Sequence, residues 1–135
     1  MISALMLMMC LIIAQFIGEA RPDEPEPPKN LKVLPKDISH DELIKTMKEF
    51  TASLGVRCTE CHVGTPTADG KMDFDFASDA KVEKINARKM MRMVNDINKK
   101  YLAKIEPGFE KVTCVTCHRG HLKPMVSVDS LEKKE

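Results

Sequence analysis

Apolar residues recur at helical spacing in two separate stretches of the chain. In the first stretch, Ser39 precedes the apolar run and Glu42 follows three residues later, which predicts a capping box at the start of a helix. The apolar stripe of this helix, widened by Ile44, is Leu43, Met47, Phe50 and Leu54. Gly55 predicts its end, because glycine readily adopts the left-handed conformation that closes a helix.

The second stretch predicts a longer helix from about Ser78 to Lys104, ended by Pro107 and Gly108. Its expected inner face is Val82, Ile85, Met90, Met93, Val94, Ile97, Tyr101 and Ile105. Between the two helices, residues 64–76 are rich in Gly, Pro, Asp and Thr and predict a loop. No segment shows an alternation that predicts a strand, so the sequence predicts an all-α fold.

Each predicted helix is followed by the pentapeptide Cys-x-x-Cys-His, at Cys58–His62 and Cys114–His118. This pattern is the attachment signature of c-type haem: the two thiols form thioether bonds with the haem vinyl groups, and the histidine ligates the iron. We therefore expect two covalently bound haem c groups, held by Cys58, Cys61, Cys114 and Cys117, with His62 and His118 as proximal ligands. The chain is an internal repeat of a Met-bearing helix, a break and this motif.

Two other readings of the cysteines explain less. A structural zinc site could use two Cys-x-x-Cys pairs, but it gives no reason for a histidine after each pair. A thiol–disulfide site needs only one such motif. Haem also accounts for the scarcity of aromatic residues, five Phe, one Tyr and no Trp in 135 residues, because two porphyrins supply apolar bulk that a small domain lacks.

The distal ligands are less sharply defined by the residues alone. Met47 lies at mid-helix on the apolar face and is the candidate for the first haem, the alternative being an ordinary core residue. For the second haem, Met90, Met91 and Met93 compete. Met90 and Met93 share a face, whereas Met91 points about 100° away from Met90.

Four basic residues close to these positions are candidates to pair with the anionic haem propionates. They are Arg57, Arg88, Arg119 and Lys123. The prediction is stronger for Arg88 and Arg119, which stand next to ligand positions, than for Arg57 and Lys123, which are as well explained as solvated surface charges.

The chain divides into four parts. Residues 1–20 read as a signal peptide or an uncleaved N-terminal anchor, residues 21–34 as a Pro-rich tether, residues 35–125 as the haem domain and residues 126–135 as a polar tail. The net charge of +1 gives no electrostatic case for nucleic acid. We expect an exported, periplasmic protein that contacts a membrane only through residues 1–20, if these are retained.

Three stretches resemble the cytochrome subunit of purple-bacterial photosynthetic reaction centres: residues 47–62, 87–98 and 112–120. That subunit carries four haems, three of which take a Met from the helix before the attachment motif. The resemblance implies a small helical multihaem cytochrome in which two repeated units pack around two haems. It implies Met47 as ligand to the first haem and favours Met90 over Met93 at the second.

These observations predict an exported dihaem cytochrome that passes single electrons between a redox donor and an acceptor, and not an enzyme. Two alternatives remain. One is a dihaem enzyme of the peroxidase or reductase type with an open iron, and the other is a fixed haem subunit of a larger membrane redox complex.

Overall fold

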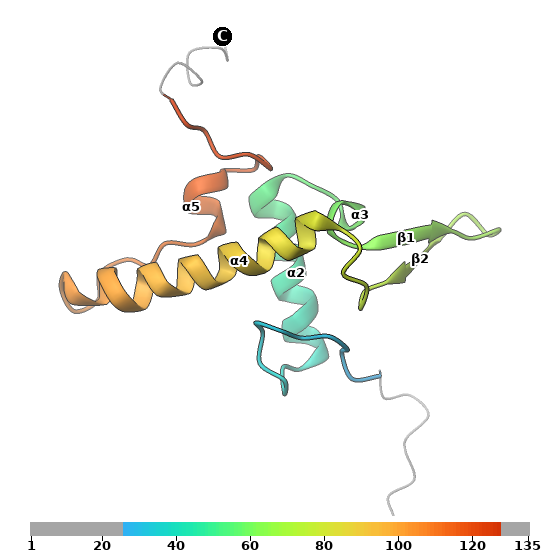
Figure 1. Ribbon diagram of the computed structural model, residues 1–135, viewed down its shortest axis with the longest axis horizontal. Helices are drawn as coiled ribbons and strands as arrows, with labels where there is room; N and C mark the ends of the chain where they lie inside the picture. Colours follow the sequence, from blue (N-terminus) through green and yellow to red (C-terminus); the bar gives the residue numbers. More distant parts are fainter. Residues whose placement is uncertain (1–25, 128–135) are drawn as a thin grey trace, which may run out of the picture.

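The computed structural model describes residues 26–127 (Figure 1). Their helices and strands are, in chain order, α2 (His40–Leu54), α3 (Cys58–Cys61), β1 (Val63–Pro66), β2 (Met72–Asp75), α4 (Val82–Asp96), the π-helix η2 (Ile97–Tyr101), the 3₁₀-helix η3 (Leu102–Lys104) and α5 (Cys114–His118). The two long helices, α2 and α4, run in different directions, and the β1–β2 hairpin projects away from them (Figure 1). The predicted signal peptide or anchor lies outside the described residues.

The first predicted helix is confirmed as α2, with both of its predicted ends. Ser39 is the N-cap: its hydroxyl accepts a hydrogen bond from the Glu42 backbone at 3.3 Å, and the Glu42 carboxylate accepts one from the Ser39 backbone at 3.4 Å. This is the predicted capping box. At the other end, Gly55 adopts φ +64° and its N–H donates to the carbonyl of Thr51.

The second predicted helix starts four residues later than expected and changes its form before it ends. The Asp75 carboxylate accepts hydrogen bonds from the backbone of Ala77 and Ser78 at 3.0 and 2.9 Å, so this segment forms a turn and α4 begins at Val82. After Asp96 the backbone continues as η2 and η3 up to Lys104. A π-helical turn of this kind inserts an extra residue and rotates the positions after it.

The prediction of an all-α fold is wrong, because the predicted loop contains an antiparallel hairpin. β1 pairs with β2 in the register Val63 with Asp75 through Pro66 with Met72. A turn at residues 67–71 joins the strands, and Gly70 adopts φ +80° there. Two signals were present in the sequence: the Asp69-Gly70 turn pair, and apolar residues at every second position, Met72, Phe74 and Phe76.

The two halves of the chain are interlocked. The short helix α5 of the second half packs against α2 of the first, and α3 of the first half packs against α4 of the second. The Gly120 N–H, just after α5, donates to the Ser53 carbonyl in the last turn of α2 at 2.8 Å. Each attachment motif is therefore positioned by the long helix of the other half.

No side chain within residues 26–127 is fully buried, and large apolar residues lie exposed on several elements. A domain whose helices expose apolar faces is not stabilised by contacts among its own side chains alone. The apolar surface fits a chain that packs around a large apolar group.

Candidate haem-attachment sites

Each Cys-x-x-Cys-His motif forms a single helical turn. In α3 the His62 N–H donates to the carbonyl of Cys58 at 2.9 Å, and this bond closes the turn between the first cysteine and the histidine. Residues three apart on a helix share one side, so Cys58 and Cys61 face the same way. In α5, Thr113 precedes Cys114, and its N–H donates to the Thr116 hydroxyl at 3.0 Å.

The four thiols are free, and each motif holds one half-buried and one exposed cysteine. Burial raises the pKa of Cys61, with the negative charges of Glu60 and Glu83 adding to the effect, and burial also raises the pKa of Cys114. A catalytic thiolate requires the opposite environment, one that lowers the pKa of the thiol. The surroundings of Cys61 and Cys114 therefore do not favour a thiolate nucleophile at these two positions.

His62 lies between the hairpin and α4. Its ring contacts that of Phe76 edge to face, with 5.1 Å between centroids. Burial lowers the pKa of His62, helped by the positive charges of Lys84 and Arg88. Nδ1 makes no hydrogen bond of standard geometry, although the Phe76 backbone lies close enough to oppose this shift in pKa. The site therefore favours neutral imidazole, the form that binds a metal.

His118 is oriented by its own chain. Its Nδ1 lies 2.9 Å from the carbonyl oxygen of His121, a distance at which an Nδ1–H donates to the oxygen. A hydrogen bond from one ring nitrogen to a backbone carbonyl fixes the tautomer and leaves Nε2 for an iron. His121 thus contacts His118 through its backbone carbonyl.

The candidate distal methionines differ in how far the protein covers them. Met47 is half-buried on α2. On α4, Met90 and Met93 are 44% and 47% exposed, whereas Met91 is half-buried. The exposed face of α4 and its continuation also carries Val82 and Tyr101.

Apolar side chains are exposed on one face of α4 and on α5, where Val115 is 51% exposed. A bound haem would cover apolar side chains of this kind.

The candidate propionate residues are placed in different ways. Arg88 is only 12% exposed, and its guanidinium donates to the Asp79 carboxylate at 2.6 Å and to the Asn30 carbonyl at 3.0 Å. Arg119 is the C-cap of α5, is exposed and adopts φ +50°. Arg57 is the exposed N-cap of α3, and Lys123 is exposed. Contact with propionates stays a prediction for all four.

Sequence reasoning missed the residue at the centre of the ionic cluster next to His62. Asp79 accepts hydrogen bonds from Lys32, Arg88 and Asn30 at 2.6, 2.6 and 3.0 Å, and Lys84 lies at 3.4 Å. These partners, Lys32 first, hold the pKa of Asp79 well below its usual range. The cluster fixes residues 30–32 to the start of α4. No local pattern marks it, because its members are up to 58 residues apart.

Asn98 was also missed as a structural residue. Its side chain donates to the Val112 carbonyl at 2.8 Å and accepts from the Val112 N–H at 2.9 Å. These two bonds hold the segment just before Cys114 against the π-helical turn.

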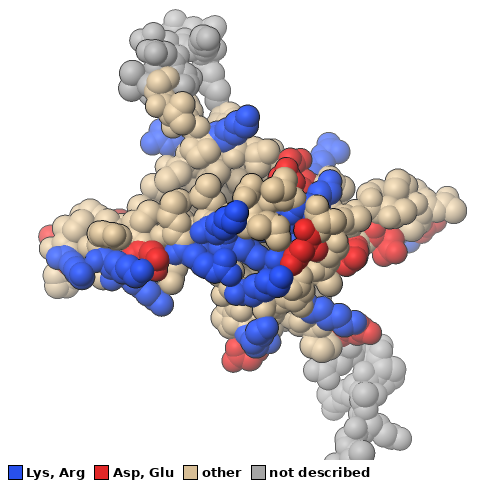
Figure 2. Space-filling view, in the orientation of Figure 1, with Lys and Arg blue, Asp and Glu red and all other residues tan. Residues whose placement is uncertain are grey.

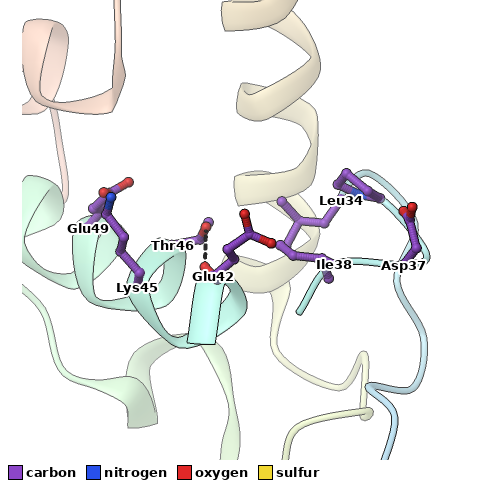
Figure 3. Close-up of a pocket in the computed structure, with 8 residues that line it drawn as sticks. Leu34, Asp37, Ile38, Glu42, Lys45, Thr46 and Glu49 are labelled. Atoms are coloured by element: carbon purple, nitrogen blue, oxygen red, sulfur yellow. Dashed lines mark hydrogen bonds between the residues drawn. The ribbon is translucent and has the colours of Figure 1, made fainter. Parts of the chain in front are cut away.

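Two hollows lie along α2. Figure 3 shows the first, of about 540 Å³, between α2 and the segment that precedes it. Leu34 and Ile38 supply apolar walls, but Asp37, Glu42 and Glu49 also line it. Carboxylates at these positions would repel haem propionates, so we do not assign a haem to this hollow.

Comparison with known proteins places the chain among cytochromes. The family model described as photosynthetic reaction centre cytochrome C subunit matches residues 14–132. The photosynthetic reaction center cytochrome c subunit of Thermochromatium tepidum is 34% identical over 99 residues, which cover 71% of this chain and 21% of that protein. Cytochrome c-554 of Chloroflexus aurantiacus is 36% identical over 86 residues, which cover 62% of this chain and 18% of that protein.

The chain belongs to the family of photosynthetic reaction centre cytochrome c subunits, and the resemblance noted in the sequence is confirmed. Membership in this family implies covalently bound haem c. The chain spans about a fifth of the length of these curated relatives. Within residues 26–127, no helix has the length and apolar character needed to cross a membrane.

Proposed function

We propose that this protein is a dihaem c-type cytochrome that transfers single electrons between redox partners. The observation that carries the proposal is the repetition of one arrangement: a one-turn Cys-x-x-Cys-His helix, preceded in the chain by a long helix that presents methionine. Cys58 and Cys61 hold the first haem, and Cys114 and Cys117 hold the second.

The chain's own residues supply the axial ligands in this proposal. His62 and His118 are the proximal ligands. The surroundings of His62 favour its neutral imidazole form, and the bond to the His121 carbonyl orients the ring of His118. Met47 and Met90 are the distal ligands, with Met93 as the alternative to Met90. A Met ligand raises the reduction potential relative to a second His.

Sulfur and imidazole together complete six-coordination and leave no open position for a substrate, so this ligand set favours an electron carrier over an enzyme. When bound, each haem supplies one-electron Fe(III)/Fe(II) chemistry. The partners are a redox donor and an acceptor, with a membrane redox complex among the candidates. Export to the periplasm is part of the proposal, because covalent haem and the apolar residues 1–20 agree with it.

The first test is the mass of the protein purified from its native host. We expect a covalent mass increment of two haems and an absorption spectrum of the c type. A polypeptide without covalent haem contradicts the proposal, and an increment of one haem contradicts the dihaem assignment.

The second test assigns the distal ligands. Met47→Ala should abolish the sulfur-to-iron charge-transfer band of one haem and lower its potential, and Met90→Ala should do the same at the other. Met91→Ala is the matched control, because Met91 points about 100° away from Met90 on the same helix. If Met93→Ala removes the second band and Met90→Ala leaves it, Met93 is the ligand.

A further inference from the structure

Charge is unevenly distributed over this nearly neutral protein. Residues 81–104, which span α4, η2 and η3, contain eight basic and two acidic residues, a net charge of +6, whereas the whole chain carries +1. Residues 63–76, the hairpin and its flanks, contain three Asp and one Lys, a net charge of −2. Figure 2 shows Lys and Arg side chains along α4 on the face in view, and acidic side chains along the hairpin.

Apart from Lys81, the half-buried N-cap of α4, the basic residues of this segment fall into two groups. Lys84 and Arg88 are 11% and 12% exposed and are paired with Asp79, so their charge is compensated within the protein. The other group is exposed, and we call it the basic face: Lys89, Arg92, Lys99, Lys100 and Lys104. Only Lys100 has an ion pair with a described residue, to Asp96 at 2.9 Å.

The basic face adjoins the proposed second haem. Lys89 precedes Met90, and Arg92 precedes Met93, the two exposed methionines whose sulfurs are the candidate ligands. A protein that docks on this face comes within one helical turn of the ligand position. Electron transfer between proteins requires this kind of close approach at a small, transient contact.

A contribution to helix stability explains the positions of only some residues of the basic face. Lys99, Lys100 and Lys104 lie near the end of the helical segment, where cations interact favourably with the helix dipole. Lys89 and Arg92 lie in mid-helix, where the dipole gives no such benefit. They are three positions apart and repel each other, which is a small local cost. Their position is better explained by an interaction outside the chain.

We propose that the basic face is the docking surface for an acidic redox protein, which exchanges electrons with the second haem. This proposal rests on the proposed function. In each encounter, one electron leaves the reduced partner and is accepted by one ferric haem, with no bond formed or broken. Opposite charges on the two surfaces accelerate association and make it sensitive to salt.

The test uses the haem-loaded protein in its oxidised form and two reductants. A reduced plant-type [2Fe–2S] ferredoxin serves as the acidic protein probe, and duroquinol serves as an uncharged probe. The variant Lys89→Gln with Arg92→Gln removes two charges from the basic face. At low ionic strength, its reduction by ferredoxin should be about tenfold slower than that of the wild type. Its reduction by duroquinol should be unchanged.

The matched control is Lys45→Gln with Lys48→Gln, which removes two exposed charges from α2 and should leave the ferredoxin rate within about twofold of the wild type. Equal ferredoxin rates in the basic-face variant and the wild type would overturn the docking proposal. An equal loss in both double variants, or a loss with duroquinol as well, would also overturn it. Wild-type protein that duroquinol cannot reduce would instead contradict the proposed function.

A second measurement separates a protein partner from a membrane. If vesicles of phosphatidylglycerol sediment the wild type but not the basic-face variant, while ferredoxin rates are equal, the face binds anionic lipid and the proposal is wrong. We expect no difference in sedimentation between the two proteins.

Discussion

The two haem units of this protein share one plan but hold their motifs by different means. In the first unit, α2 is followed after three residues by α3, and Gly55 makes the turn between them. In the second unit, α4 continues through a π-helical and a 3₁₀ turn, and a long connection leads to α5. The short connection between α2 and α3 depends on the backbone conformation of Gly55. The long connection before α5 is held by the side chain of Asn98.

The proximal histidines show the same contrast. His62 is in edge-to-face contact with the ring of Phe76, just after β2, and its pKa is lowered by burial and by the charges of Lys84 and Arg88 on α4. His118 is positioned locally, by the carbonyl of His121. The comparison teaches that the first site depends on the fold of the second unit, whereas the second site is oriented largely by its own segment.

Gly55→Ala should have the largest effect, because it disrupts the point where the units interlock. A Cβ on Gly55 would meet the Gly120 carbonyl oxygen at 2.0 Å, and its φ of +64° disfavours any side chain. We expect a loss of about 3–5 kcal/mol in the free energy of unfolding. Urea unfolding of the haem-loaded protein, followed by circular dichroism, measures it.

The control for this prediction is Gly108→Ala, in the long connection of the second unit. Gly108 also has a positive φ, +83°, but nothing lies within 4 Å of a Cβ there. The free energy of unfolding of Gly108→Ala should therefore fall only by the cost of a side chain at a positive φ, about 1–2 kcal/mol. Equal losses in the two variants would show that the contact between Gly55 and Gly120 contributes nothing.

Asn98→Ala should weaken the second unit alone. It removes both hydrogen bonds to the Val112 backbone, which we expect to cost about 1–3 kcal/mol. Hydrogen exchange at the Val112 amide should accelerate, while amides in α2 keep their protection. Asn95→Ala, a change at an exposed position of the same helix, is the control. Unchanged exchange at Val112 would mean that other contacts hold this connection.

Asp79→Asn should alter the pH dependence of stability through the ionic cluster beside His62. The pKa of Asp79 is lowered in the folded state by its hydrogen bonds to Lys32, Arg88 and Asn30. A lowered pKa means that the carboxylate stabilises the fold at pH values above about 3.9, the ordinary pKa of Asp, and that this stabilisation is lost as the pH falls further.

The measurement is urea unfolding of wild type and Asp79→Asn at pH 6, 4 and 3. The variant should be less stable at pH 6 and 4, and the difference should shrink at pH 3. A difference that is the same at all three pH values would show that the charge of Asp79 does not matter. Asp73→Asn, on the exposed hairpin, is the control and should show no such trend.

Local signals in the sequence predicted local structure well. Ser39, Glu42 and Gly55 are sufficient to place both ends of α2, because caps depend on residues within one turn. The two attachment motifs were found because covalent chemistry requires a fixed spacing. The hairpin was missed because its Gly, Pro and Asp residues suggested a loop, although Asp69-Gly70 and the alternation from Met72 to Phe76 were informative.

Interactions between distant residues could not be predicted in this way. Asp79 has partners from residue 30 to residue 88, and Gly55 lies close to Gly120, 65 residues further along the chain. Nothing in a single sequence marks these pairs, since neither depends on a local pattern. The start of α4 was predicted too early for a different, local reason: the Asp75 carboxylate accepts hydrogen bonds from the backbone N–H groups of Ala77 and Ser78 and holds this segment in a turn.

The smallest predicted effects concern the helix starts, where the two units differ most simply. The N-cap of α2 is Ser39, with a complete capping box, whereas the N-cap of α4 is Lys81, without a side-chain hydrogen bond. Ser39→Ala should cost about 1 kcal/mol, because an N–H of the first turn loses its partner. Lys81→Ser should stabilise the protein by about 0.5–1 kcal/mol, because it adds a cap and removes a positive charge from the positive end of the helix dipole. The midpoints of urea unfolding at pH 7 should therefore shift in opposite directions, and a shift in the same direction would show that the N-terminus of α4 is held by contacts other than its cap.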